Sequence, residues 1–399
     1  MRFGTALSDA ATARDAGACA ARDALTAVGD AKPVLAVVFV SVGYDDVGSV
    51  YEAVRGVLGD VPVVGGTAAG RVFAPPLYEK RAVNVSIVAG DDVVAHVGVT
   101  PILTPDLVEA VAVAERLMTD ADGAALGGLT ALTCLVFAPA KRVDGEALVA
   151  AVRKGSSARA QLAGCVTGDD FTLDRSGVLS EGSVRDDRIV IAAVSSRTPL
   201  GIGVRHGWRR IGPSHIVTRS DGRRLRELDG RRALDVWLED IRAAGATPPT
   251  GLSSRALAIW MANAYELGVG GPNRVVPIVR APHDTTDGGA VLLSASVSDG
   301  AEVGLVHATP DELLAASRDA AGAARDACGG AIVGALLFAC AGRLAVLGDR
   351  FPEEPRGAAE RLGVPLGGAC VYGEIARARR DVDAFHNTTA VVVAFPADP

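Results

Sequence analysis

Several polar side chains follow the last buried runs of the sequence, where they are placed to bind a small ligand. In chain order they are Cys340, Arg343, Tyr372, Glu374, His386 and Asn387. An arginine guanidinium is a planar fork for a carboxylate, while glutamate and asparagine can receive or orient an amine or amide. These residue types together predict a site for a small polar ligand. The alternative is that Arg343 and Glu374 pair with each other and that His386 caps a strand.

Three glycine-rich segments recur at the ends of apolar runs and are interpreted as turns. They are Gly65-Gly66-Thr67, Gly164-Cys165-Val166-Thr167-Gly168 and Gly367-Gly368-Ala369-Cys370. Ligands of open α/β folds gather at such strand ends, where backbone amides approach a small molecule. We therefore expect the turns to face a shared hollow and add Gly65, Gly66, Thr67, Cys165, Thr167 and Gly368 to the candidate ligand-binding residues. The alternative is that these glycines only permit close packing or a positive φ. None of the segments is a nucleotide-binding fingerprint.

Catalysis on the same scaffold is a second hypothesis. A Cys340–His386 pair could act as a nucleophile and its base, and Lys141 or Glu374 could assist. The neighbouring Asp169 and Asp170 are candidates for acid–base chemistry. The chain would then be a hydrolase or lyase of a small amide or carboxylate. No GxSxG elbow or HExxH helix supports this hypothesis, and we assign no catalytic residue.

The histidines and cysteines show no metal-ligand spacing. The six cysteines form no CxxC pair and are interpreted as reduced thiols of the core. We expect neither a metal site nor a cofactor. The alternative is haem, which needs only one proximal ligand and an apolar slot, with His283 or His386 as the candidate ligand.

Composition limits the partners of this 399-residue chain. The formal net charge is −7 and aromatic residues make up 4%, which is typical neither of a phosphate-binding surface nor of a base-stacking platform. The one basic cluster, Arg219 to Arg232, is interleaved with acidic residues and is interpreted as an ion-paired surface. The sequence has neither a signal peptide nor a membrane-spanning run, so we expect a cytoplasmic protein that binds neither nucleic acid nor membrane.

One pattern occurs three times: an apolar run, a helical stretch, a short apolar run into a glycine segment, and another strand. The first runs cover 35–45, 132–142 and 334–343, the glycine segments 61–70, 160–170 and 364–375, and the last strands 82–90, 188–196 and 388–395. A phenylalanine precedes the glycine by 26, 27 and 29 residues in the three copies. Continuous apolar runs favour buried strands. An internal repeat of α/β units is therefore predicted.

Hairpins and capped helices are predicted to link the copies. Strand pairs at 83–99, 189–205 and 290–307 are interpreted as hairpins, and Thr104-Pro105-Asp106 and Thr309-Pro310-Asp311 as helix starts. The fold class is α/β, with two related lobes of mixed sheets built from repeated strand-helix-strand-hairpin units. We place the lobes at 1–205 and 206–399.

These segments also resemble a known family. The stretches VPVVGGTAAGRV, LAGCVTGDDF, LRELDGRRALD, GALLFACAGR, PLGGACVYGEI and FHNTT occur in an order similar to that of FIST sensory proteins, with an N-terminal FIST lobe followed by a C-terminal one. The resemblance covers nearly the whole chain.

The resemblance implies a sensory module of bacterial signal transduction that binds small molecules such as amino acids or related metabolites. It carries Arg343, Glu374 and Asn387 over as candidate contacts. Because the pattern uses almost all of the chain, output is expected to pass through a separate partner such as a histidine kinase. Some family members bind haem and sense nitric oxide, which is the alternative function.

Overall fold

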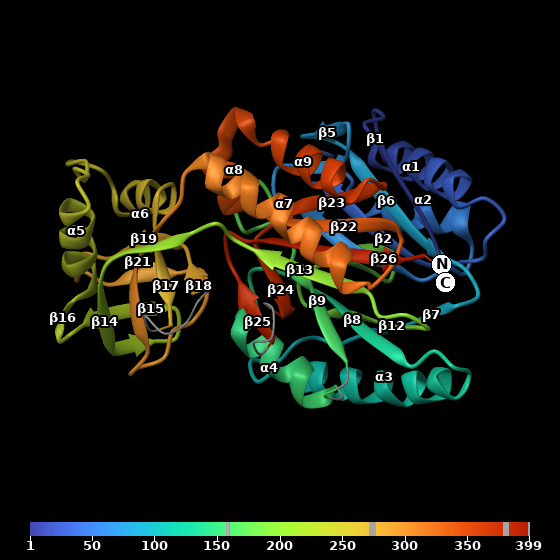
Figure 1. Cartoon of the computed structure of the whole chain (residues 1–399), viewed down its shortest axis with the longest axis horizontal. Coiled ribbons are helices and arrows are strands. Elements are labelled where there is room, and N and C mark those ends of the chain that lie inside the picture. The colour runs from blue at the N-terminus through green and yellow to red at the C-terminus, as the bar shows by residue number, and fades with distance from the viewer. Residues whose placement is uncertain (157, 159, 271–276, 378–382, 398–399) are drawn as a thin grey trace.

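The chain forms two lobes of unequal size (Figure 1). The structure is a computed structural model that describes residues 1–399 apart from 157, 159, 271–276, 378–382 and 398–399. Residues 209–307 form the smaller lobe, here called the inserted lobe, and the remainder forms the core lobe. The predicted α/β class and the presence of two lobes are confirmed, although the lobes seen here are not the halves 1–205 and 206–399, because the chain returns to the core lobe after β21.

Three units of the same element order build the core lobe. The first comprises β1 (Arg2–Ser8), α1 (Ala13–Val28), β2 (Pro33–Ser41), α2 (Ser49–Leu58), β3 (Val63–Ala68), β4 (Val72–Ala74), β5 (Leu77–Glu79) and β6 (Val83–Ala89). The second comprises β7 (Val93–Val99), α3 (Val108–Leu126), β8 (Ala131–Ala138), α4 (Gly145–Gly155), β9 (Gln161–Val166), β10 (Val178–Ser180), β11 (Ser183–Arg185) and β12 (Val190–Ser196). The third comprises β13 (Gly201–Arg205), α7 (Pro310–Ala327), β22 (Ile332–Cys340), α8 (Ala341–Leu347), the 3-10 helix η1 (Gly348–Arg350), α9 (Glu353–Leu362), β23 (Leu366–Val371), β24 (Gly373–Arg377), β25 (Asp383–His386) and β26 (Ala390–Pro396).

The inserted lobe interrupts the third unit between β13 and α7. It contains β14 (Arg209–Asp221), β15 (Arg224–Leu228), β16 (Arg231–Arg232), α5 (Ala233–Ala243), α6 (Ser254–Ala262), β17 (Tyr265–Val269), β18 (Ile278–Arg280), β19 (Pro282–Thr285), β20 (Val291–Leu293) and β21 (Glu302–His307). Its strands pair antiparallel, and α5 packs on them through Val236 and Trp237. The relatedness that the sequence predicts therefore lies among the three units of the core lobe.

Each unit donates a hairpin to a neighbouring sheet, and this exchange is cyclic. The three sheets have the orders β1-β6-β2-β3-β10-β11, β25-β24-β9-β8-β12-β7 and β13-β26-β22-β23-β4-β5. In each sheet one pair of strands from the same unit runs parallel, namely β2–β3, β8–β9 or β22–β23, and the remaining pairs are antiparallel. The predicted mixed sheets are confirmed, and each unit contains a hairpin, although β4–β5, β10–β11 and β24–β25 do not lie where the sequence analysis placed the hairpins.

The three repeated phenylalanines meet where the sheets come together. The rings of Phe39, Phe137 and Phe338 are fully buried, with centroids 6.0–6.3 Å apart and edge-to-face contacts. Such edge-to-face contacts add stabilisation to that which the rings gain from the burial of their apolar surface. The near-constant spacing in the sequence thus reflects one shared core.

The hairpins predicted at 83–99, 189–205 and 290–307 are wrong. The strands on either side of each short turn lie in different sheets or do not pair: β6 and β7, then β12 and β13, belong to different sheets, and β20 does not pair with β21. In the first two cases the turn carries the chain out of one sheet and into the next, whereas β20 and β21 lie in one sheet but are separated by β15 and β14. An adjacent apolar run and a turn residue do not distinguish this crossing from a hairpin.

The glycine segments are strand interiors rather than turns. Gly65, Gly164 and Gly368 lie inside β3, β9 and β23 with φ of 122°, 145° and 158°. A Cβ at each would lie 2.0 Å from a carbonyl oxygen of the neighbouring parallel strand. These positions therefore need glycine for close backbone approach, which is the alternative considered in the sequence analysis.

One of the two predicted helix starts is confirmed. Thr309 caps α7 in a capping box, in which its side chain accepts from the amide of Glu312 and the Glu312 side chain reaches back. At the other position, Thr104 does not cap a helix. There α3 begins at Val108 after Leu107, which has a left-handed φ of 54°.

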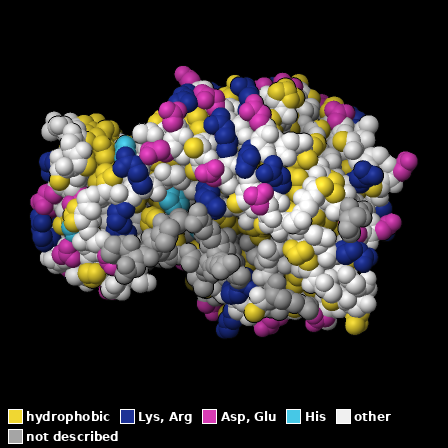
Figure 2. Space-filling view, in the orientation of Figure 1, with side chains coloured by type: hydrophobic (Ala, Val, Ile, Leu, Met, Phe, Trp, Pro, Cys, Tyr) yellow, Lys and Arg dark blue, Asp and Glu magenta, His cyan; other side chains and the backbone are white. Residues whose placement is uncertain are grey.

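Charged side chains of both signs are interspersed on the face that Figure 2 shows. The predicted ion pairing of the basic cluster is confirmed, since Arg219 binds Glu227 at 2.7 Å and Arg231 binds Glu239 at 2.6 Å. In the described ranges, no helix has the length and apolar character needed to cross a membrane.

Candidate functional site

The glycine-bearing strands of the three units end against one another. Three backbone hydrogen bonds close a ring, from the amides of Gly168, Tyr372 and Ala69 to the carbonyl oxygens of Thr67, Val166 and Cys370, at 3.1, 2.9 and 2.8 Å. The segments thus face one another, as expected. They touch directly and pack on the phenyl cluster, however, rather than lining an open hollow.

Gly66, Thr67 and Thr167 contact neighbouring parts of the protein at this place. The Thr67 hydroxyl accepts a hydrogen bond from the amide of Gly177 at 3.0 Å, and the Thr167 hydroxyl donates to the carbonyl of Ala138 at 3.2 Å. A Cβ on Gly66 would meet the Thr167 side chain at 2.5 Å. In this structure the three residues hold strand ends together.

Tyr372 points toward a loop of the second unit. Its hydroxyl donates to the carbonyl of Asp169 at 2.9 Å, accepts from the amide of Phe171 at 2.7 Å and also contacts the Asp169 carboxylate. Burial and the adjacent carboxylate raise the pKa of Tyr372. Asp169 also accepts from the amides of Leu173 and Arg175, so it organises the loop rather than pairing with Asp170 for catalysis.

A buried polar network lies between the lobes and contains four of the other predicted residues; it is here called the junction cluster. Its members are His206, Glu266, Cys340, Arg343, Glu354, Glu374, Asn387, Thr388 and Thr389, and each is at most 6% exposed. Glu266 comes from β17 of the inserted lobe and the others from the core lobe. The structure therefore brings together four of the predicted polar residues, Cys340, Arg343, Glu374 and Asn387.

Arg343 is the only arginine of the cluster, and its guanidinium is fully engaged. Nε donates to Glu354 at 2.6 Å, Nη1 to the carbonyls of His206 and Thr388 at 2.9 and 3.3 Å, and Nη2 to the carbonyl of Leu313 at 2.6 Å. The buried ion pair is thus with Glu354 and not with Glu374. With its donors used inside the protein, the guanidinium orients the cluster instead of offering a fork to a carboxylate.

Two further carboxyl groups of the cluster are held in their neutral form. Burial raises the pKa of Glu266 to about 8, although Thr388 donates to it at 2.6 Å and Arg343 lies near. Burial also raises the pKa of Glu374 well above its usual value, and its contacts with Cys340 and with the Thr389 amide offset this only in part. Because Glu354 already neutralises Arg343, a second charge here would lack a counterion.

Several polar atoms of the cluster make no hydrogen bond to the described residues. They are Oε1 of Glu266, Oε2 of Glu354, Oε1 of Glu374 and Nδ2 of Asn387. Buried polar atoms are nearly always hydrogen-bonded, so such a concentration points to water or a ligand at this place. The opposite atom of Asn387, Oδ1, accepts from Ser294 of the inserted lobe at 2.6 Å, which fixes the direction of the amide.

The thiols near the cluster are poor nucleophiles. Cys165 lies opposite Glu374 in the β9–β24 ladder, and burial, with a smaller contribution from the adjacent Glu374 carboxyl group, raises the pKa of both Cys165 and Cys340. A raised pKa leaves the thiol protonated at neutral pH. Lys141 lies elsewhere, in a surface ion pair with Asp174 at 3.2 Å.

The two candidate haem ligands occupy different places. His283 is exposed on β19 of the inserted lobe, whereas His386 is buried and its Nε2 lies 3.0 Å from the carbonyl oxygen of Ala376. Haem binding stays a prediction. Among the described residues, no group of three or more His, Cys, Asp or Glu is arranged to hold a metal ion.

Three titratable members of the cluster escaped the sequence analysis: His206, Glu266 and Glu354. Glu266 carried a signal, since it stands alone in the apolar stretch AYELGVG. Glu354 lies in PEEP at the start of α9, where an acidic residue is ordinary helix chemistry. His206 follows β13 and is neutral because burial lowers its pKa to about 3.

Two models of known protein families match most of the chain. The model of the FIST N domain matches residues 34–231 and that of the FIST C domain matches residues 233–377. The chain belongs to the FIST family. The two matches confirm the FIST resemblance noted in the sequence. FIST domains are sensory domains of signal transduction. A search of curated proteins finds no match.

Solved structures similar to this FIST chain include two cyanuric acid hydrolases. One, from A. caulinodans, is 13% identical, with 100% of this chain and 99% of that chain covered and a TM-score of 0.34. The other, described as an evolutionary innovation by structural concatenation, is 11% identical, with 98% and 99% covered and a TM-score of 0.30. At such TM-scores these likenesses carry no argument about the present chain.

Proposed function

We propose that this FIST protein is a sensory protein of bacterial signal transduction that binds a small polar metabolite of the amino-acid class in the junction cluster. The observation that supports the proposal is the concentration of buried polar atoms on Glu266, Glu354, Glu374 and Asn387 that find no partner in the described part of the chain. A ligand with several polar groups would satisfy them together, whereas leaving each unpaired is unfavourable by about 1–3 kcal/mol.

Charge balance favours a ligand that carries an ammonium group. Burial holds Glu266 and Glu374 neutral, and among the described residues no cation is left to pair with them. An ammonium group beside either would allow that carboxyl group to ionise and would form a charge-assisted hydrogen bond. Asn387 Nδ2 is a donor for the carboxylate of the same ligand. Arg343 then acts as a positioning residue.

The position of the cluster couples binding to the arrangement of the lobes. The chain passes between the lobes twice, at 205–209 and 307–310, and in Figure 2 the surface narrows between the inserted lobe on the left and the core lobe on the right. Glu266 belongs to one lobe, and Glu374 and Asn387 to the other. A ligand that contacts both sides would shift their relative arrangement by its differential affinity for the two states. A separate partner such as a histidine kinase would read that change.

Calorimetric titration with amino acids tests the proposal. Each amino acid is compared with the acid that lacks its amine and the amine that lacks its carboxylate. We expect saturable binding of an amino acid that is tighter than that of either comparison compound, and a loss of at least about tenfold in its affinity in Glu374→Gln, since a charge-assisted hydrogen bond contributes about 1.5–3 kcal/mol.

The matched control is Glu115→Gln, which makes the same change at an exposed position of α3. It should bind as the unmodified protein does. Absence of binding by every amino acid, or equal binding by Glu374→Gln, would contradict the proposal.

A further inference from the structure

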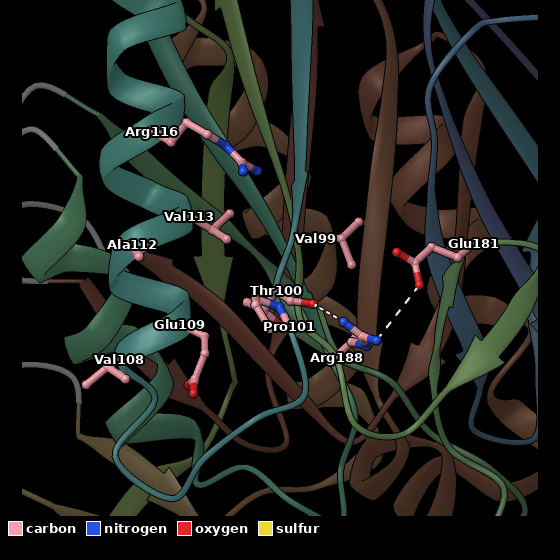
Figure 3. A pocket seen from close by; sticks show the side chains of 10 residues that line it. All are labelled: Val99, Thr100, Pro101, Val108, Glu109, Ala112, Val113, Arg116, Glu181 and Arg188. Atoms are coloured by element: carbon pink, nitrogen blue, oxygen red, sulfur yellow. Dashed lines mark hydrogen bonds and ion pairs between the residues drawn. The ribbon is translucent and has the colours of Figure 1, made fainter.

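The second unit contains an open groove that lies apart from the junction cluster. It runs between the first turns of α3 and the end of β7 and has a volume of about 630 Å³. Figure 3 shows Val113 and Arg116 directed from α3 toward the strands, with Val99 on the opposite side. A space of this size can hold a small organic molecule.

The groove exists because α3 packs on its strand differently from the matching helices. In the third unit a Cβ on Gly203 of β13 would lie 1.9 Å from the backbone oxygen of Ala320 in α7. Gly98 of β7 is the equivalent residue of the second unit. Through the paired strands, Gly98 lies level with the residue before Phe137, as Gly203 lies level with the residue before Phe338. A Cβ added to Gly98 would meet only side chains, Val113 at 2.5 Å and Arg116 at 3.2 Å. The backbone of α3 therefore stands farther from its strand.

The residue at one position of β7 explains why α3 stands farther from this strand. Gly4 in the first unit and Gly201 in the third lie where a Cβ would be 2.3 and 1.9 Å from a helix carbonyl oxygen. The matching residue of the second unit is His96, by the same ladder count. It shares the strand face of Gly98, because side chains two residues apart point the same way. An imidazole at this position is incompatible with the close approach seen in the other units.

The end of the groove carries backbone strain. Leu107 has a left-handed φ of 54° immediately before Val108 and Glu109, which line the groove. This conformation is unfavourable by about 1–2 kcal/mol for a residue with a Cβ. It persists because Leu107 is buried and Glu109 accepts hydrogen bonds from the Thr104 hydroxyl at 2.8 and 2.9 Å. Strained segments of this kind cluster at ligand sites.

Arg116 gives the groove its chemistry. Within the described part of the chain its guanidinium makes no ion pair or hydrogen bond, so all of its donors are available. Across the groove, Arg188 is held by the carbonyl of Thr100 at 2.8 Å and lies 4.0 Å from Glu181. The walls beside Arg116 are aliphatic, from Val99, Val113 and Ala112.

We propose that this groove is a second ligand site, in which Arg116 binds the carboxylate of a small aliphatic acid whose hydrocarbon chain packs on Val99 and Val113. A guanidinium fork matches a carboxylate in geometry and charge, and the valines favour a hydrocarbon body over a polar one. The site is independent of the junction cluster and would give the sensor a second input.

Calorimetric titration of the full chain with hexanoate tests this assignment, with hexylamine and hexanol as probes that lack the negative charge. We expect saturable hexanoate binding, weakened at least about tenfold in Arg116→Gln, because a hydrogen bond to a charged group contributes about 1.5–3 kcal/mol. Ala112→Phe fills the exposed side of the groove and should abolish binding without a change in the core.

The control for lost charge is Arg55→Gln on the exposed face of α2, which should leave hexanoate binding unchanged. Glu374→Gln should also leave it unchanged, so that a failure of the junction site and a failure of this groove are distinguished. The assignment is overturned if the unmodified protein shows no saturable binding, if Arg116→Gln binds equally well, or if hexanol binds as tightly as hexanoate.

Discussion

Arg343 shares the interior with three glutamates, and their protonation follows from the number of cations available. Glu354 takes the guanidinium, and Glu266 and Glu374 remain neutral. A buried ion pair of this kind contributes little by itself, but removal of one partner leaves an uncompensated charge. The cluster is therefore sensitive both to the loss of its arginine and to pH.

Replacement of Glu266 should change the pH dependence of stability. Its pKa rises from 4.5 in the unfolded chain to about 8 in the folded protein. The folded state therefore binds more protons between these values, and its free energy of unfolding falls as pH rises through this window, by up to about 1.4 kcal/mol per pH unit. Glutamine does not ionise, so in Glu266→Gln this fall in the free energy of unfolding is absent. The variant should therefore be more stable than the unmodified protein above pH 8. Urea unfolding from pH 5 to 9 measures the slope, and an unaltered slope would show that Glu266 ionises normally.

Loss of the guanidinium should destabilise the fold. Arg343→Met leaves Glu354 buried without a partner, and we expect a decrease of about 3–5 kcal/mol in the free energy of unfolding, measured by urea denaturation. The second change in Arg343→Met/Glu354→Gln removes the stranded charge and should recover part of the loss. Arg350→Met, which removes an exposed arginine paired with Asp311 and Glu353, should leave the midpoint nearly unchanged. Equal effects of Arg343→Met and Arg350→Met would refute the buried-pair interpretation.

At the scale of single elements, the glycines inside β3, β9 and β23 decide how the sheets meet. The sequence predicted the apolar strands, the intervening helices and the recurrence of the glycines, because each depends on local pattern. It misplaced the hairpins and treated Gly65 as a turn residue, since a positive φ within a strand depends on a neighbouring carbonyl that only the assembled sheet supplies. For the same reason it found Arg343 and Glu374 but not Glu354, whose pairing depends on the packing of α9.

Two glycine substitutions test whether the glycines inside the strands are needed for close backbone approach. Gly65→Ala places a methyl group 2.0 Å from the carbonyl oxygen of Val38 at a φ of 122°, so we expect severe destabilisation or failure to fold. Gly123→Ala in α3 meets nothing within 4 Å and should stabilise the protein by about 0.5–1 kcal/mol. Thermal unfolding of both variants checks this. A Gly65→Ala protein as stable as the unmodified one would mean that β2 and β3 do not approach so closely.

At the scale of the whole molecule, three units in cyclic exchange form the core lobe, and one insertion adds a lobe across the junction cluster. The third unit supplies every member of the site except Glu266, which comes from the inserted lobe and meets Arg343 and Asn387 only when β17, α8 and the segment before β26 pack together. Sequence patterns predicted the units; the insertion within the third unit and its contribution to the cluster depend on tertiary packing.

Native mass spectrometry of the purified protein tests the central claim most directly. After equilibration with a mixture of amino acids, the full chain should carry one small adduct with the mass of an amino acid, and the adduct should be released on collisional activation. The same treatment of Glu374→Gln should give the bare mass, and that of Glu115→Gln the adduct. A bare mass for the unmodified protein, or an adduct that Glu374→Gln retains undiminished, would contradict ligand binding at the junction cluster.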